Sequence, residues 1–338
     1  SRTYLYYSIS GAALAFIGMI FVLTYGTNPT TEFVYGGMLD MARVADKKDL
    51  LLAVFLMSFV GFGVKAALFP VHAWLPTVSV APTPVTALLH AVAVVKAGAF
   101  AIIRIIYYTF GTDFLYGTWA QYAAMGLAMF TIVFGSVMAV KEQHFKRRLA
   151  YSTVSNLSYM LMGAALMTPA GMVGSLSHLV FHGLMKISLF YCAGAVLVKT
   201  GKEYVQDLRG FGKIMPFTFT VFTIGSIAMV GIPPLCGFVS KWNLLTAAAA
   251  TNSWWGVLAI VTLIISAILT AIYLFTVVAN AWFRPLNNDM AALAGKSCDP
   301  SWQMKLPLAV LSAVVILFGI FSTPFVQWLR DVAAGLML

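Results

Sequence analysis

Charged residues are scarce in this sequence. Asp, Glu, Lys and Arg make up 9% of its 338 residues, whereas hydrophobic residues make up 61%. A soluble globular protein has about 25% charged residues, so a soluble chain of this composition could not cover its surface with polar groups. We therefore expect the protein to lie in a lipid bilayer. The formal net charge of +10 indicates basic loops and buried lysines, not a nucleic-acid partner.

Cysteine is scarce as well. Cys192, Cys236 and Cys298 lie far apart and form no CxxC pair, which argues against an iron–sulfur cluster or a zinc site. The sequence also lacks a GxGxxG fingerprint and a P-loop. We expect no cofactor and no metal in this chain, and any redox chemistry to occur in partner proteins. The absence of a Met before Ser1 predicts a trimmed, partly covered or split chain.

Long apolar runs are abundant. A helix needs roughly 20 mostly apolar residues to cross a bilayer, and runs of this length are too long for barrel strands. The sequence therefore predicts an all-α polytopic membrane protein. About nine transmembrane helices are expected, near 4–25, 49–69, 84–109, 119–140, 149–167, 171–198, 214–246, 254–283 and 305–328.

The loop residues predict an orientation. With nine spans, twelve Lys and Arg residues fall on the side of the N-terminus and five on the opposite side. Cytoplasmic loops carry the excess of basic residues, so we expect a cytoplasmic N-terminus in a bacterial or archaeal inner membrane.

The remaining four basic residues, Lys65, Lys96, Lys186 and Lys241, lie inside predicted spans. Each costs roughly 2.5–3.5 kcal/mol near the bilayer centre, so a functional role is expected. The alternative is that each lysine reaches the interface or pairs structurally. Desolvation penalises the charged form of lysine, so a buried lysine can gain and lose a proton near neutral pH.

Acidic residues, in contrast, are missing from the predicted spans. All eleven Asp and Glu residues fall in loops or at span ends, Glu142 among them. Either the buried lysines are mostly neutral, or an acidic partner comes from helices outside this sequence.

Histidines accompany the lysines. His178, His182 and Lys186 follow each other at intervals of four residues and line one face of a helix. His90 precedes Lys96 on another predicted helix. Histidine titrates nearest neutrality and passes protons readily. The HxxxH spacing also suits a metal, but no third ligand shares that face.

Two predicted spans are interrupted by glycine and proline, each near a buried lysine. The first break contains Pro70 and Pro76, and the second contains Gly231, Pro233 and Pro234. Paired discontinuous helices mark transport sites in inverted-repeat transporters. Ordinary kinks are the alternative for either break alone.

A polar stripe, Ser152, Ser155, Asn156 and Tyr159, runs along the span near 149–167. Such residues can hold water or bond neighbouring helices, and helix packing is the favoured interpretation.

Four stretches in order resemble a known family: VKAALFPVHAWLPTVSVAPTPVTALLHAVAVVKAG, FKRRLAYSTVSNLSYM, HLVFHGLMK and GIPPLCGFVSKW. They are similar to the antiporter-like, proton-translocating subunits of respiratory complex I, Mrp cation/proton antiporters and membrane-bound hydrogenases. The resemblance implies an inverted-repeat fold of about 14 helices, of which this chain looks like the sixth helix onward. It assigns residues 1–110 to the end of a truncated first repeat, 111–285 to a second repeat, and 286–338 to a final helix and C-terminus.

The resemblance also implies roles for the buried residues. Lys65 matches a lysine that, in the family, pairs with a glutamate on the fifth helix. That glutamate is missing from this sequence, so we expect a partner chain or segment to supply it. The other matches are relay positions, with Lys241 at the exit: His90, Lys96, His178, His182, Lys186 and Lys241.

The expected function is that of a proton-translocating subunit of a redox-driven complex, with other membrane subunits as partners. Two alternatives stay open: a non-conducting membrane scaffold, or one subunit of an Mrp-type sodium/proton antiporter. A variant that pairs with a soluble partner for inorganic-carbon uptake is a further alternative.

Overall fold

The computed structural model describes residues 2–26, 37–287, 290 and 297–335, and every regular element in this part of the chain is helical. The helices are α1 (Arg2–Tyr25), α2 (Met41–Val44), η1 (Ala45–Lys47), α3 (Lys48–Lys65), α4 (Trp74–Val78), α5 (Thr83–Ala91), α6 (Val94–Arg104), the π-helix η2 (Ile105–Phe110), α7 (Thr112–Leu115), α8 (Trp119–Lys141), α9 (Phe145–Ala165), α10 (Pro169–Thr200), η3 (Val205–Leu208), α11 (Phe211–Ile214), α12 (Pro216–Val230), α13 (Cys236–Ala250), α14 (Trp254–Phe283), α15 (Trp302–Ile320) and α16 (Thr323–Gly335).

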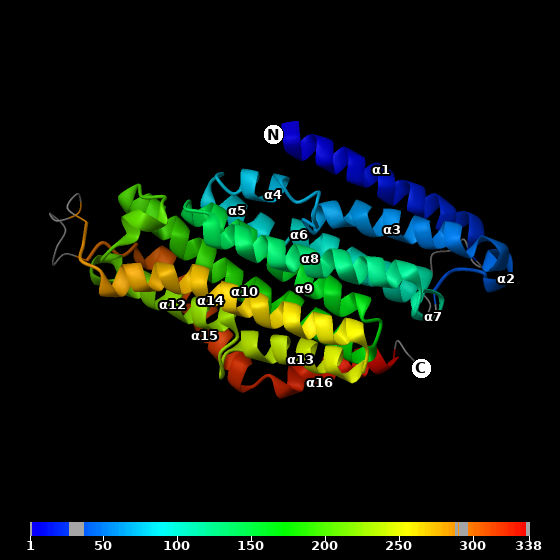
Figure 1. Ribbon diagram of the computed structural model, residues 1–338. Coiled ribbons are helices and arrows are strands. Elements are labelled where there is room, and N and C mark those ends of the chain that lie inside the picture. The colour runs from blue at the N-terminus through cyan, green and yellow to red at the C-terminus, as the bar shows by residue number, and fades with distance from the viewer. Residues whose placement is uncertain (1, 27–36, 288–289, 291–296, 336–338) are drawn as a thin grey trace.

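The long helices lie side by side in an elongated bundle (Figure 1). Within the described residues, six stretches are long and apolar enough to cross a membrane: Tyr4–Tyr25, Thr83–Phe110, Trp119–Lys141, Pro169–Thr200, Trp254–Phe283 and Trp302–Ile320. This confirms the all-helical membrane architecture that the composition predicts.

Hydroxyl side chains fix where three of these helices begin. Thr118, Thr168 and Ser253 have extended backbones, and each side-chain oxygen accepts a hydrogen bond from the amide three residues later. Such N-caps satisfy one of the amides that the first turn leaves without a partner. The caps therefore position α8, α10 and α14 along the bundle.

Two helices end where the sequence places glycine and proline. The first expected break separates α3, which ends at Lys65, from α4, which begins at Trp74. Pro70 lies in the connecting segment, whereas Pro76 lies inside α4. Ala67 adopts a left-handed backbone conformation, with φ of 55°, so the chain turns away from the helix axis before the proline.

The second break separates α12, which ends at Val230, from α13, which begins at Cys236. Gly231 has φ of 94°, a conformation that glycine adopts at low cost and that terminates a helix. Pro233 and Pro234 follow and cannot donate backbone hydrogen bonds that would continue the helix. The half-helices α12 and α13 thus meet end to end within the bundle.

Two further interruptions were not expected. Between α5 and α6, the amides of Val92 and Ala93 both bond to the carbonyl oxygen of Leu88, so the helix loses its regular ladder without a Gly or Pro at that point. Near the C-terminus, the stretch 305–328 is divided between α15 and α16. There Pro324 follows the break and lacks the amide that would continue the ladder.

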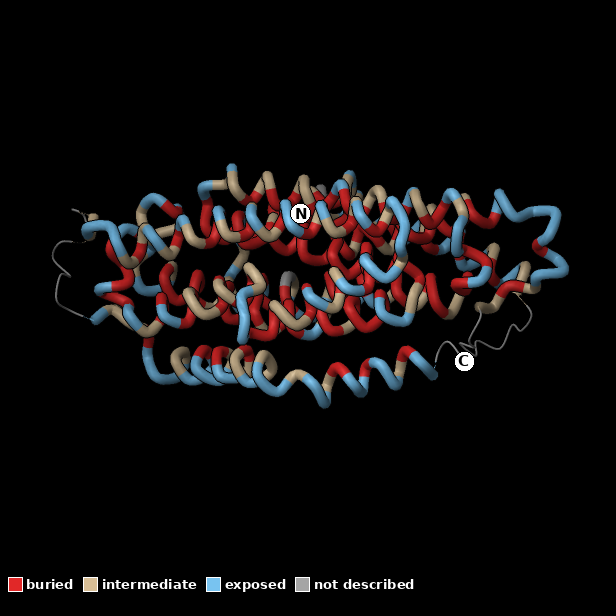
Figure 2. The backbone as a smooth tube through the Cα atoms, turned by 60° about the horizontal axis from the view of Figure 1, so that its bottom comes forward, coloured by how far each residue is buried: buried red, intermediate tan, exposed pale blue. Residues whose placement is uncertain are grey.

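Helix α10 occupies the centre of the bundle. It packs against α5, α9, α12, α13, α15 and α16, and Figure 2 shows buried backbone concentrated along the middle of the molecule. In contrast, α1 and α15 expose many apolar side chains, among them Phe16 and Val310. Exposed apolar surface of this kind suits contact with lipid or with other membrane helices.

Candidate functional site

The centre of the site is one face of α10. His178, His182 and Lys186 are fully buried, as their spacing predicts for residues on the core side of a helix. The Lys186 ammonium donates to the carbonyl oxygen of Leu149 at 2.9 Å and to the hydroxyl of Ser152. The rings of His178 and His182 stack with their centroids 5.7 Å apart. A titratable column therefore runs along α10.

Helix α9 supplies polar partners to this column. Besides Ser152 at Lys186, the amide oxygen of Asn156 lies 3.3 Å from Nε2 of His178. The ring of Tyr159 stacks on His178 with 5.3 Å between centroids. Sequence reasoning interpreted these residues as helix packing, because their spacing marks only a polar stripe. The structure places three of the four against residues of this column.

Ser155, the fourth residue of that stripe, does join helices. Its hydroxyl lies 2.8 Å from that of Ser136 on α8 and 3.2 Å from that of Ser266 on α14. All three side chains are fully buried. Interhelical hydroxyl contacts of this kind stabilise packing in membranes.

Lys241 lies at the second helix break. Its ammonium donates to the carbonyl oxygens of Met229 and Val230, at 2.7 and 3.1 Å. These carbonyls end α12 and have lost their helical partners, and the helix dipole makes this end negative. The same ammonium lies 5.3 Å from the ring centroid of Tyr159. Lys241 thereby connects the break to the α9 and α10 column.

Ser240, which sequence reasoning did not single out, contacts the column from the same helix. Its hydroxyl lies 2.9 Å from Nδ1 of His178. Its position next to Lys241 was visible in the sequence. The sequence could not show that Ser240 faces α10, because that orientation depends on where α13 begins after the break.

Lys96 reaches the column from α6. Its ammonium donates to the carbonyl oxygen of Leu179, the residue after His178. A Cβ atom at Gly183 would lie 3.1 Å from that ammonium, so the absence of a side chain there makes room for the lysine. His90 belongs to α5, but its side chain lies outside the described part of the structure.

Lys65 stands at the first helix break, separate from the column. Its ammonium lies 3.2 Å from the hydroxyl of Tyr4 and 3.4 Å from that of Ser8, both on α1. A Cβ atom at Gly98, two residues beyond Lys96, would lie 2.7 Å from the Cβ of Lys65, so α3 and α6 approach closely here. Neither hydroxyl partner of Lys65 was predicted, because nothing local in the sequence pairs α1 with α3.

Acidic side chains stay away from these lysines within the described residues. The ion pair of Arg43 with Asp40 and the contact of His144 with Glu203 involve no residue of the column. The described residues also contain no cluster of three or more His, Cys, Asp or Glu side chains that could hold a metal ion. The site therefore consists of lysines, histidines, hydroxyls, the Asn156 amide and main-chain carbonyls.

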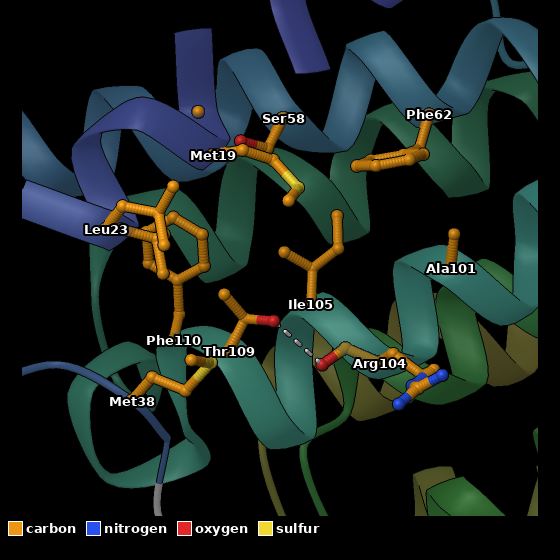
Figure 3. A pocket seen from close by; sticks show the side chains of 12 residues that line it. Met19, Leu23, Met38, Ser58, Phe62, Ala101, Arg104, Ile105, Thr109 and Phe110 are labelled. Atoms are coloured by element: carbon orange, nitrogen blue, oxygen red, sulfur yellow. Dashed lines mark hydrogen bonds between the residues drawn. The ribbon is translucent and has the colours of Figure 1, made fainter. Parts of the chain in front are cut away.

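A cavity of about 250 Å³ lies between α1, α3, α6 and η2, away from the column (Figure 3). Its wall is mostly apolar, and none of the buried lysines or histidines above lines it. Arg104 and Thr109 lie at one edge, while Ser58 is a polar group on α3. We therefore do not include this cavity in the site.

Comparison with known proteins gives a consistent picture. Residues 1–270 match the family described as NADH:quinone oxidoreductase/Mrp antiporter, transmembrane. A relative named NADH-quinone oxidoreductase subunit N, from Desulforudis audaxviator, is 34% identical over 310 residues. That alignment covers 86% of this chain and 60% of the relative.

Two further proteins resemble the chain over most of its length. One Na(+)/H(+) antiporter subunit from Alkalihalophilus pseudofirmus is 31% identical over 334 residues, covering 92% of this chain and 40% of that protein. A chain of the Mrp complex from Dietzia has the same fold, with a TM-score of 0.82 at 22% identity, covering 99% of this chain and 67% of that one. The chain spans about 60% of the length of the subunit N relative from Desulforudis audaxviator.

Proposed function

Because this chain belongs to the NADH:quinone oxidoreductase/Mrp antiporter transmembrane family, we propose that it is a proton-translocating membrane subunit of a redox-driven complex. The observation that carries the proposal is the buried column on α10. It is contacted by Lys96 from one side and is connected to Lys241 through Tyr159 on the other.

Protons move along this column by transfer between neighbouring titratable groups and hydroxyls. The proposed order is Lys65, then Lys96 with His90, then His178, His182 and Lys186, and finally Lys241. The ring nitrogens of His182 have no hydrogen-bond partner among the described residues. His182 can therefore exchange a proton with its neighbours without first breaking a hydrogen bond, and histidine passes protons readily.

The two lysines at the helix breaks are the proposed switching points. Lys65 is the last residue of α3, and its ammonium lies beside the hydroxyls of Tyr4 and Ser8. Lys241 belongs to α13, but its ammonium reaches the carbonyl oxygens that end α12, which stabilise its charged form. In this proposal, a change of charge near each lysine decides whether that lysine holds its proton.

The proposal also covers the repeats, the number of spans and the orientation of the chain. We propose that residues 1–110 form the end of a first inverted repeat and residues 111–285 a second one, within a fold of about nine transmembrane segments here. The matching helix breaks, each next to a lysine, support this symmetry. The basic residues favour a cytoplasmic N-terminus in a bacterial or archaeal inner membrane.

Partners belong to the proposal as well. Lys65 has hydroxyl partners on α1 but no acidic partner among the described residues. A glutamate from another chain or segment would complete its environment, and electron transfer would take place in other subunits. The broad apolar surface of α1 supports contact with further membrane helices.

Two alternatives remain to be separated by experiment. An Mrp-type protein would exchange sodium for protons, and a scaffold would hold the lysines without conducting. The similarity to the Na(+)/H(+) antiporter protein of Alkalihalophilus pseudofirmus supports the antiporter alternative.

The experiment uses sealed vesicles that contain the intact complex, with wild type compared to Lys65→Ala. Internal pH is followed after addition of an electron donor and, separately, after a sodium gradient is imposed. Lys48→Ala is the matched control, because Lys48 is an exposed lysine at the other end of α3. We expect donor-driven pH change to be lost in Lys65→Ala and kept in Lys48→Ala. A response to sodium alone would favour the antiporter, and unchanged traces in every variant would favour the scaffold.

A further inference from the structure

His178 has a hydrogen-bond partner at each of its two ring nitrogens. Nδ1 lies 2.9 Å from the hydroxyl of Ser240, and Nε2 lies 3.3 Å from the amide oxygen of Asn156. His182, one turn further along α10, has none at either nitrogen among the described residues. The two stacked histidines therefore differ in how the protein holds their ring protons.

The orientation of the Asn156 amide decides which nitrogen of His178 carries hydrogen. The amide nitrogen of Asn156 donates to the main-chain carbonyl oxygen of Ser152 at 2.8 Å. A carbonyl can only accept, so the amide oxygen must be the atom that faces His178. That oxygen also can only accept, and therefore Nε2 must be the protonated nitrogen.

The hydroxyl of Ser240 can adapt to either charge state of His178. It lies 2.9 Å from Nδ1 of His178 and 3.2 Å from the carbonyl oxygen of Gly237. When His178 is neutral, Nδ1 has no hydrogen, and the hydroxyl donates to it. When His178 is an imidazolium, Nδ1 donates to the hydroxyl oxygen, whose own proton turns to Gly237. Both ring nitrogens thus keep their hydrogen bonds in both states, which avoids the cost of an unpaired buried group.

We propose that Asn156 is a positioning residue that keeps His178 protonated at Nε2, so that His178 exchanges protons only at Nδ1, on the side of Ser240. Uptake adds one proton to Nδ1 and changes the ring charge from 0 to +1, and release returns the same proton. The exchanging atom faces α13, the half-helix that carries Lys241. The relevance to transport rests on the proposed function, whereas the tautomer is a property of the folded chain.

The test is nitrogen-15 magnetic resonance on the intact complex in lipid, with labelled histidine. The spectrum of His178→Gln identifies the His178 signals. At pH 8 we expect a protonated Nε2 and an unprotonated Nδ1, with at most about one tenth of the other tautomer, since one hydrogen bond biases the pair by about tenfold. In Asn156→Leu the two tautomers should become similarly populated. Asn156→Asp keeps an acceptor and should restore protonated Nε2.

Ser155→Ala is the matched control, because Ser155 lies beside Asn156 but bonds to Ser136 and Ser266. It should leave the His178 signals unchanged. Protonated Nδ1 in neutral wild type, or an unchanged tautomer in a folded Asn156→Leu protein, would overturn the inference. If Asn156→Leu fails to fold, Ser240→Ala serves instead. It should shift the Nδ1 signal and leave Nε2 protonated, and an unshifted Nδ1 signal would count against the assignment.

These outcomes separate the inference from the proposed function. A protein with protonated Nε2 but no proton transport would contradict the transport role alone. A transporting protein with protonated Nδ1 would contradict the role of Asn156 alone.

Discussion

The ammonium of Lys241 donates to the carbonyl oxygen of Met229 at 2.7 Å, which joins the start of α13 to the end of α12. This contact places a buried cation on the carbonyls that the helix break leaves without partners. It gives the second break both a structural and a proposed transport role, and the two roles can be measured separately.

Replacing Lys241 by Met should abolish most proton transport and cost little stability. The side chain keeps its length, but the titratable group is lost, and we expect transport to fall on the order of a hundredfold. The end of α12 loses a cation, which costs about 1 kcal/mol. Donor-driven pH change and thermal unfolding measure the two effects. Lys213→Met is the control at an exposed lysine. Large destabilisation with normal transport would instead indicate that Lys241 only caps the end of α12.

Replacing Tyr4 by Phe should weaken transport through Lys65. The hydroxyl of Tyr4 lies 3.2 Å from the lysine ammonium, and one hydrogen bond to a charged group contributes about 1.5–3 kcal/mol. We expect transport to fall about tenfold, while the ring, which packs 5.2 Å from that of Trp74, keeps the local structure. Initial rates of pH change in vesicles provide the measurement. Tyr6→Phe, on the exposed side of α1, should behave as wild type.

Two glycine substitutions should differ in whether they mainly reduce transport or mainly reduce stability. In Gly183→Ala, the new methyl would lie 3.1 Å from the ammonium of Lys96 and 3.3 Å from the carbonyl oxygen of Ala91. Shifts of a few tenths of an ångström relieve both contacts, so stability should fall much less than in Gly237→Ala, while transport falls several-fold. In Gly237→Ala, the methyl would overlap the carbonyl oxygen of Ala228, which cannot move without shifting α12. We expect a loss of more than about 3 kcal/mol, visible as reduced yield of folded protein. Equal behaviour of the two variants would contradict this distinction.

Stability should depend on pH through His144, which lies between α8 and α9. Burial lowers the pKa of His144 below its ordinary value of 6.5, although the carboxylate of Glu203, 3.5 Å away, acts in the opposite direction. The folded protein therefore binds this proton less readily than the unfolded chain, and stability should decrease as the pH falls below 6.5. Thermal unfolding between pH 8 and pH 5.5 tests this. The loss of stability on acidification should be smaller in His144→Asn than in wild type. An equal loss in both proteins would show that other groups cause it.

Sequence patterns predicted the features that depend on local chemistry. Apolar runs predicted the helical membrane fold, and the spacing of His178, His182 and Lys186 predicted a shared face that the structure shows fully buried. The order of glycine and proline residues near Gly231 predicted where α12 would end, because those residues act through their own backbones.

Features that depend on tertiary packing were not visible in the sequence. The break between α5 and α6 contains neither Gly nor Pro, so no local pattern marks it. The contacts of Lys65 with Tyr4 and of His178 with Ser240 join residues about 60 positions apart. Asn156 was interpreted as a packing residue, since a polar stripe has the same spacing whether it bonds a neighbouring helix or a titratable ring.

The central claim is that protons pass through the buried column on α10, and Lys186→Met tests it most directly. Lys186 is fully buried and contacts Leu149 and Ser152, whereas Lys199, at the end of the same helix, is exposed and provides the control. Protons moved per electron should be measured in vesicles that contain the intact complex. We predict that Lys186→Met lowers this ratio while Lys199→Met keeps the wild-type value. A wild-type ratio in a folded, assembled Lys186→Met complex would contradict the account.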